Sequence, residues 1–165
     1  MRKFIFVFCM GFLMEIAFAA DIVEGFWLSV DEKTQKTTAG WEIYQVNGVL
    51  FGKMLSIAGY PPTEKAALCK SSYEGFPIPG NVKEMPLAET PWIFGLKQDG
   101  AGAWSRGSII NPEDGRMYKC KVIFRKADGK KYKVDTLEMR GEIGLGIGRS
   151  QFWTRCTKES ASAVR

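Results

Sequence analysis

The chain has 165 residues, of which 45% are hydrophobic and 25% charged, with a formal net charge of +5. These values indicate one folded domain and exclude a disordered chain. The sequence contains no His, which excludes His-based serine and cysteine catalytic centres and His-ligated metal sites. Its 18 glycines and its 13% of aromatic residues favour β structure with many turns.

The first 19 residues have the features of a secretory signal peptide. Basic residues at 2–3 precede an apolar run over 4–14, and Ala17 and Ala19 supply the small residues that a signal peptidase recognises. The run is too short to span a bilayer of about 30 Å, although a retained anchor is the alternative. We therefore expect cleavage after Ala19 and a single domain, residues 20–165, in the periplasm or outside the cell.

Turn residues divide the rest of the chain into eight short apolar segments. The Asn47-Gly48 pair is a strong hairpin signal, because both positions of that turn need a positive φ, and similar turn residues recur at 99–102, 111–115 and 128–129. The expected strands cover residues 25–30, 40–46, 49–57, 92–97, 103–110, 117–125, 131–140 and 149–157. Eight strands joined by hairpins predict an all-β protein, an eight-stranded up-and-down antiparallel barrel.

One long connection interrupts this spacing between the third and fourth strands. Residues 58–90 hold five of the seven prolines and no convincing strand. A connection of this length without regular structure is unusual in a compact domain. It either covers one side of the barrel as a surface flap or forms a lid over a ligand opening, and the sequence leaves both open.

Alternation identifies the side chains expected inside the barrel. Residues 118–124 alternate apolar and basic side chains, interrupted only by Ile123, whereas the parity changes within 131–140 and predicts a β-bulge near Asp135-Thr136. The expected inward-facing residues, and so the candidate cavity, are Trp41, Ile43, Met54, Phe94, Tyr118, Val122, Phe124, Met139 and Phe152. An eight-stranded barrel is either filled by such side chains or just able to hold one small ligand, here with Tyr118 as its polar tip.

Strand direction predicts a closed floor at one end of this barrel. In an eight-stranded meander the last strand runs antiparallel to the first, so the end of one lies beside the start of the other. We therefore expect Arg155 to pack on the indole of Trp27, next to Gly25. Arg149 lies six residues earlier, about 20 Å along the strand, at the opposite rim.

Seven basic residues lie on one predicted hairpin, and Asp128 is the only acidic residue between them. They are Lys119, Lys121, Arg125, Lys126, Lys130, Lys131 and Lys133. They form a solvated outer face that discourages edge pairing, or they dock on an anionic surface such as lipid head groups. Cleavage would remove two of 23 basic and one of 18 acidic residues, leaving a charge of +4, which is too mild to predict a nucleic-acid partner.

The carboxylates and cysteines do not form a recognisable reaction centre. Glu42, Asp135 and Glu138 could do acid–base work only if the fold brought them together, and their spacing does not predict this, so we expect no catalytic residue, metal or cofactor. Cys120 and Cys156 lie two strands apart, about 10 Å, beyond the roughly 7 Å that a disulfide allows between Cα atoms. The fourth cysteine, Cys9, belongs to the predicted signal peptide, so any disulfide of the mature chain must use Cys69.

Three motifs carry a family resemblance. Residues 104–118 read W-S-R-G-S-I-I-N-P-E-D-G-R-M-Y, residues 148–155 read G-R-S-Q-F-W-T-R, and residues 25–27 read G-F-W. Together they resemble the domain-of-unknown-function 2147 family of exported bacterial proteins, with Ser150 in place of its Thr and Ser72 in place of a second Cys that some members carry. The resemblance implies a calycin-type barrel similar to the lipocalins, and it implies no reaction.

These observations predict a function of binding. The leading hypothesis is an exported, non-enzymatic β-barrel that binds a small apolar or amphipathic ligand. The alternative is a module that binds a protein or an envelope surface through its basic hairpin, and a carboxylate-based enzyme is the less favoured third hypothesis.

Overall fold

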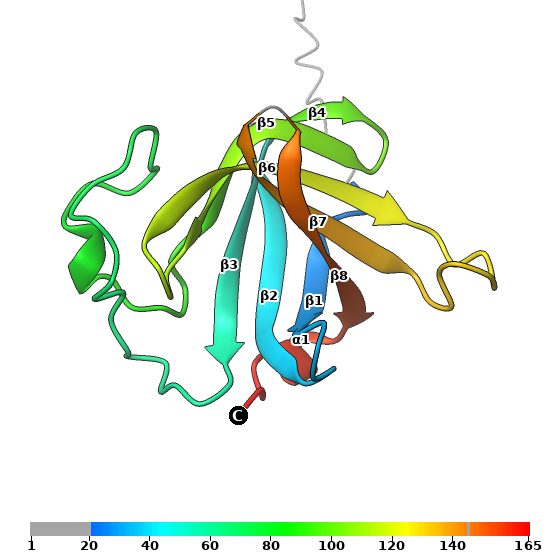
Figure 1. Ribbon diagram of the computed structural model, residues 1–165, viewed down its shortest axis with the longest axis horizontal. Coiled ribbons are helices and arrows are strands. Elements are labelled where there is room, and N and C mark those ends of the chain that lie inside the picture. Colours follow the sequence, from blue (N-terminus) through cyan, green and yellow to red (C-terminus); the bar gives the residue numbers. More distant parts are fainter. Residues whose placement is uncertain (1–20, 145) are drawn as a thin grey trace, which may run out of the picture.

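Eight antiparallel strands, paired in sequence order, close into a barrel (Figure 1). The computed structural model describes residues 21–144 and 146–165, so the predicted signal peptide lies outside the described residues. The strands are β1 (Gly25–Val30), β2 (Thr37–Val46), β3 (Val49–Ile57), β4 (Ile93–Gly100), β5 (Ala103–Asn111), β6 (Arg116–Arg125), β7 (Thr136–Gly144) and β8 (Ile147–Cys156). The predicted eight-stranded up-and-down barrel is confirmed.

Closure comes from β1, which pairs with both β2 and β8. Trp27 lies opposite Trp41 on one side and Arg155 on the other. The predicted hairpin between β2 and β3 is present, with Asn47 at φ 52° and Gly48 at φ 72°, the left-handed region that this turn requires.

The seventh strand begins later than the sequence analysis predicts. The Asp128 carboxylate accepts the backbone N–H groups of Lys130 (2.8 Å) and Tyr132 (2.9 Å), which folds residues 126–135 into a loop of their own. The strand starts only at Thr136, and its pairing with β6 continues without interruption from there. The bulge predicted near Asp135-Thr136 is therefore wrong, because the change of parity marks the start of the strand.

Aromatic side chains from distant strands meet inside the barrel. Trp27 of β1 contacts Phe124 of β6 edge to face, with ring centroids 6.4 Å apart, and Trp41 stacks on Trp153 of β8 at 4.8 Å. Trp27, Trp104 and Trp153 are at most 2% exposed. Side chains of this size fill much of the interior of an eight-stranded barrel.

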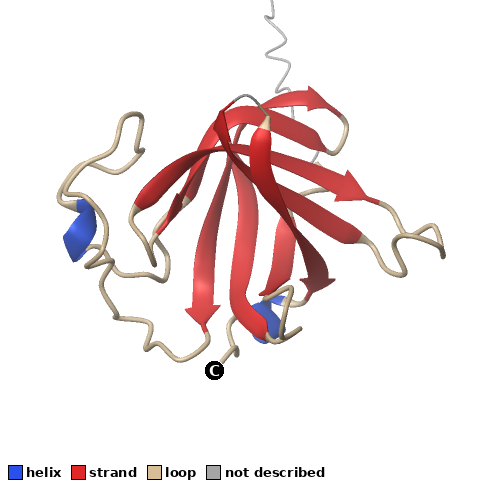
Figure 2. Ribbon diagram, viewed as in Figure 1, coloured by secondary structure: helices blue, strands red, loops and turns tan. Residues whose placement is uncertain are grey.

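The β3–β4 connection, residues 58–92, forms a second, smaller core outside the barrel. Phe76 packs edge to face on Phe94 of β4, with ring centroids 5.4 Å apart, and it also contacts Trp92 at 6.4 Å. Figure 2 shows this segment mostly as loop, with one short turn of 3₁₀ helix, η1 (Val82–Glu84). The arrangement is that of a flap covering one side of the barrel.

The chain ends on the outside of the barrel. The short helix α1 (Lys158–Ala161) lies against β2, where a Cβ added to Gly40 would come within 1.9 Å of the Ala161 carbonyl oxygen. The Ser56 hydroxyl of β3 donates to the same carbonyl (2.6 Å) and accepts the N–H of Val164 (3.1 Å). In the described part of the chain, every helix is too short to reach across a membrane.

Candidate functional site

The floor of the barrel is built around Arg155. Its guanidinium lies 4.2 Å from the centre of the Trp27 ring and 5.9 Å from that of Phe124. It also donates to the backbone oxygens of Glu24 (3.1 Å) and Ile22. Gly25 leaves room for it, because an added Cβ would lie 3.0 Å from a guanidinium nitrogen. The contact predicted from strand direction is present: Arg155, itself exposed, covers the buried Trp27 at this end.

Most of the predicted cavity residues do face the interior. Five of them are at most 7% exposed, and two more, Tyr118 and Phe124, are partly buried against the same core. The five are Trp41, Ile43, Met54, Val122 and Met139. Since they contact one another and the tryptophans, they form a packed core more than the lining of an open cavity.

Two predicted cavity residues point elsewhere. Phe152 is 38% exposed and lies 6.1 Å from Tyr132 outside the barrel, while its neighbour Trp153 is fully buried inside. Phe94 is buried, but under Phe76 on the outer face of β4, since its neighbour Ile93 takes the inward position. In both cases adjacent large apolar residues hide the alternation that identifies the inward face.

A hollow of about 480 Å³, here called the rim hollow, lies at the end of the barrel away from the floor. It forms where the β3–β4 connection meets the β5–β6 turn and the end of β7. Tyr118, which lines it, lies six residues before Phe124 along β6, about 20 Å from the floor. The lining residues are Lys70, Ser72, Tyr73, Glu74, Gly115, Arg116, Met117, Tyr118 and Ile143.

Two tyrosines set the polar contacts of the rim hollow. The Tyr73 hydroxyl accepts the N–H of Lys70 (2.8 Å) and donates to the carbonyl oxygen of Gly115 (2.8 Å), which ties the connection to the β5–β6 turn. Burial raises the pKa of Tyr73 to about 12, so its hydroxyl stays neutral at physiological pH. Tyr118 donates to the Asp114 carboxylate (3.1 Å). Both hydroxyls therefore help to shape the hollow.

The rim hollow also exposes apolar side chains beside cations. Ile143 is 72% exposed and Met117 is 40% exposed. Lys70 and Arg116 supply two positive charges beside the carboxylates of Glu74 and of Asp114, the second of which accepts the Tyr118 hydroxyl. The lining thus combines apolar surface with two cations.

A second hollow, of about 410 Å³, lies outside β2 and β3. Tyr44 and Phe51 stack there with ring centroids 5.8 Å apart. Lys53 bonds to Glu89 and lies 3.3 Å from the Glu42 carboxylate, so the charged groups of this hollow already satisfy one another. Glu42 therefore has Lys53 as its ion-pair partner.

The other two candidate carboxylates, Asp135 and Glu138, also have partners of their own. Asp135 accepts the backbone N–H of Ala127 (2.9 Å). Glu138 lies 2.7 Å from Arg125 and accepts the Ser150 hydroxyl (2.8 Å). Although burial opposes it, these two bonds hold the pKa of Glu138 below its usual value. The three carboxylates thus have separate partners.

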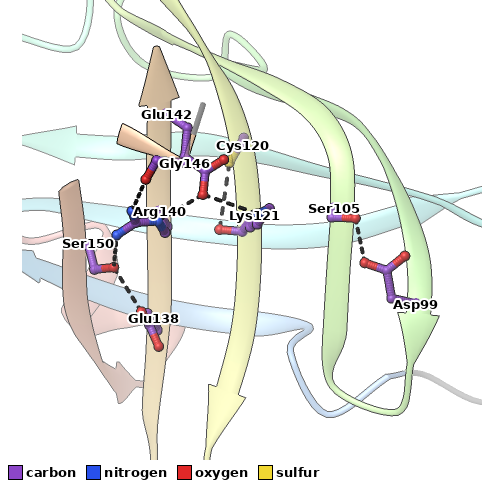
Figure 3. Close-up of polar contacts among 9 residues, drawn as sticks. All are labelled: Asp99, Ser105, Cys120, Lys121, Glu138, Arg140, Glu142, Gly146 and Ser150. Carbon is purple, nitrogen blue, oxygen red and sulfur yellow. Dashed lines mark hydrogen bonds and ion pairs between the residues drawn. The ribbon is translucent and has the colours of Figure 1, made fainter. Parts of the chain in front are cut away.

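Figure 3 shows that Glu138 belongs to a wider ionic network on the outside of β6, β7 and β8. Glu142 binds Arg140 (2.8 Å) and Lys121 (3.1 Å), and Arg140 reaches the Gly146 carbonyl oxygen (2.8 Å). Two members of the predicted basic hairpin, Lys121 and Arg125, are therefore neutralised by acids of β7. Within residues 21–144 and 146–165, no three His, Cys, Asp or Glu side chains gather as a metal ion would need.

The three described cysteines are free thiols. Cys120 on β6 and Cys156 on β8 are separated by β7, as the strand order predicts. Burial raises the pKa of Cys120, and to a lesser degree that of Cys69, so both are poor nucleophiles.

Comparisons with known proteins agree with this fold. The family profile described as "Uncharacterized protein conserved in bacteria (DUF2147)" matches residues 25–155. A solved structure described as "Protein HP1028 from the human pathogen Helicobacter pylori belongs to the lipocalin family" is similar, with 17% sequence identity, a TM-score of 0.62, and coverage of 83% of this chain and 84% of that chain. At this identity the likeness concerns the fold alone. No curated protein matches the sequence.

Proposed function

Because the chain belongs to the DUF2147 family of bacterial proteins, for which no reaction is described, we propose its function from its geometry. It is an exported, non-enzymatic protein that binds a small amphipathic molecule at the rim hollow of its lipocalin-like barrel. One observation carries the proposal. The rim hollow combines exposed apolar side chains, an inward-facing tyrosine and two cationic side chains in about 480 Å³, a volume typical of small-molecule sites.

The packed interior supports the rim as the binding place. Trp27, Trp104 and Trp153 occupy the space below Tyr118, so a ligand has room at the mouth and little room deeper. A bound molecule would lay its apolar part against Met117, Tyr118 and Ile143.

The two cations of the rim favour an anionic polar group on the ligand. Lys70 and Arg116 both line the hollow, and Arg in particular binds carboxylates with two parallel hydrogen bonds. The proposed ligand class is therefore an alkyl or aryl chain that ends in an anionic group.

Dodecanoate is a suitable probe for a binding titration by calorimetry. We expect binding to the wild-type protein, and about a tenfold or larger loss for Ile143→Asp, because the carboxylate would meet both the apolar chain and the anionic group of the probe. Val46→Asp is the matched control, since Val46 is 49% exposed and lies at the end of β2, beside the β2–β3 turn and away from both the rim hollow and the β6–β7 loop.

Circular dichroism should show the same fold for both variants, because both positions are exposed. Absence of dodecanoate binding to the wild type, or equal affinities for the wild type and Ile143→Asp, would contradict the proposal. Native mass spectrometry of freshly purified protein would then report whether another small molecule copurifies.

A further inference from the structure

The loop between β6 and β7, residues 126–135, extends from the barrel at the opposite end of the molecule from the β3–β4 connection (Figure 1). It contains four lysines, all exposed, and no arginine. They are Lys126, Lys130, Lys131 and Lys133. In the part of the chain that the structure describes, none of these four takes part in an ion pair, unlike Lys121 and Arg125 in the neighbouring strand.

The two carboxylates of the loop are turned towards its own backbone. Asp128 accepts the N–H groups of Lys130 and Tyr132, and Asp135 accepts that of Ala127. The Tyr132 carbonyl oxygen in turn accepts the N–H groups of Asp128 (3.0 Å) and Gly129 (3.2 Å). These bonds give the loop a defined shape in which the lysines remain free to meet a partner.

Apolar surface lies among these lysines. Val134 is 54% exposed, and Phe152 of β8 is 38% exposed beside Tyr132. The Lys131 ammonium lies 5.2 Å from the centre of the Tyr132 ring. The loop therefore presents positive charge and aromatic surface together.

We propose that the β6–β7 loop docks the protein on an anionic lipid surface. The lysines would meet the head groups, while Val134 and Phe152 would enter the interfacial layer, where aromatic and aliphatic side chains are stabilised. The absence of Arg from the loop favours lipid over protein, because Lys is depleted and Arg enriched at protein–protein interfaces. This surface is separate from the rim hollow, so the two proposals can fail independently.

Cosedimentation with vesicles tests the proposal. We expect the full chain to bind vesicles that contain phosphatidylglycerol and phosphatidylcholine, more weakly as salt is added, and to bind vesicles of phosphatidylcholine alone much less. Each lysine near an anionic surface contributes about a fivefold change in partitioning. The double variant Lys130→Gln/Lys131→Gln should therefore bind the anionic vesicles roughly 25-fold more weakly.

The matched control is Lys33→Gln/Lys36→Gln in the loop between β1 and β2, which changes the net charge equally at exposed positions. It should retain nearly wild-type binding. Equal losses in the two double variants, wild-type binding by the first, or equal binding to both kinds of vesicle would overturn the proposal. Binding of single-stranded DNA with the same dependence on Lys130 and Lys131 as the vesicles would assign the surface to nucleic acid instead.

Discussion

Two arginines of β8 illustrate how position along a strand decides the role of a residue. Arg155 lies over Trp27 and donates to two backbone carbonyl oxygens at the floor. Arg149 lies at the opposite rim and binds Glu32 at 2.9 Å, with both side chains well exposed. Exposed ion pairs contribute little to stability, whereas a cation over an indole with bonded carbonyls contributes more.

We therefore expect Arg155→Met to lower the free energy of unfolding by about 1 kcal/mol or more. Arg149→Met should change it by less than half of that. Urea unfolding followed by tryptophan fluorescence measures both values. Equal midpoints for Arg155→Met and the wild type would show that the floor contact adds nothing to stability.

Single residues also show where sequence reasoning reaches its limit. Arg155 was predictable because strand direction alone places it beside Trp27. Phe152 and Trp153 were not distinguishable, because both are large and aromatic and a shift of one residue exchanges the inward and outward faces. The rim hollow was missed except for Tyr118, because residues of the connection, of the β5–β6 turn and of two strands, β6 and β7, meet there only after folding.

At the scale of elements, ion pairs join the outer faces of β6 and β7. A hydrogen bond from Arg140, and a weaker effect of the hydrogen bond from Lys121, hold the pKa of the Glu142 carboxyl below its ordinary value of 4.5. A carboxyl whose pKa is lower in the folded state contributes stability above its ordinary pKa, and this contribution is lost as the pH falls through the folded value.

Glu142→Gln should therefore be less stable than the wild type at neutral pH, with a difference that shrinks as the pH falls below about 4.5. Thermal unfolding across that pH range measures it. Glu113→Gln, at an exposed position in the β5–β6 turn, serves as the control and should follow the wild type at every pH. A constant difference between Glu142→Gln and the wild type would indicate that ionisation of Glu142 is unimportant.

The bounds of elements were predictable where turn residues define them. The ranges 25–30 and 49–57 agree with β1 and β3, since the second begins directly after Asn47-Gly48. The start of β7 was not predictable, because side-chain bonds from Asp128 decide it. The connection could be recognised by its prolines, but its core depends on contacts such as Phe76 with Phe94 that have no local signal.

At the scale of the whole molecule, the two ends of the barrel differ. At one end Arg155 covers Trp27, and the other end carries the rim hollow, while the connection and the β6–β7 loop extend in opposite directions (Figure 1). A ligand at the rim and a membrane at the loop would therefore contact different parts of the surface. Both proposed contacts presuppose that the protein lies in the cell envelope.

That setting requires export, and the first 19 residues make it testable. We expect the mature protein to begin at Ala20, because Ala17 and Ala19 occupy the positions that a signal peptidase reads. Intact mass measurement of protein recovered from the periplasm of a producing bacterium gives the N-terminus directly. A mass that includes Met1 would remove the basis for placing the protein outside the cytoplasm.

The pairing of β1 with β8 also constrains the order in which the barrel can form. Arg155 bonds to the backbone of Glu24, 131 residues away, so the first strand lacks its second neighbour until synthesis reaches the end of β8. Contacts this distant in sequence slow folding, and the strand edges left open meanwhile can pair with other chains. A ribosome-bound or translocating chain would thus expose both edges until its last strand arrives, and these edges are the surfaces that a chaperone would have to cover.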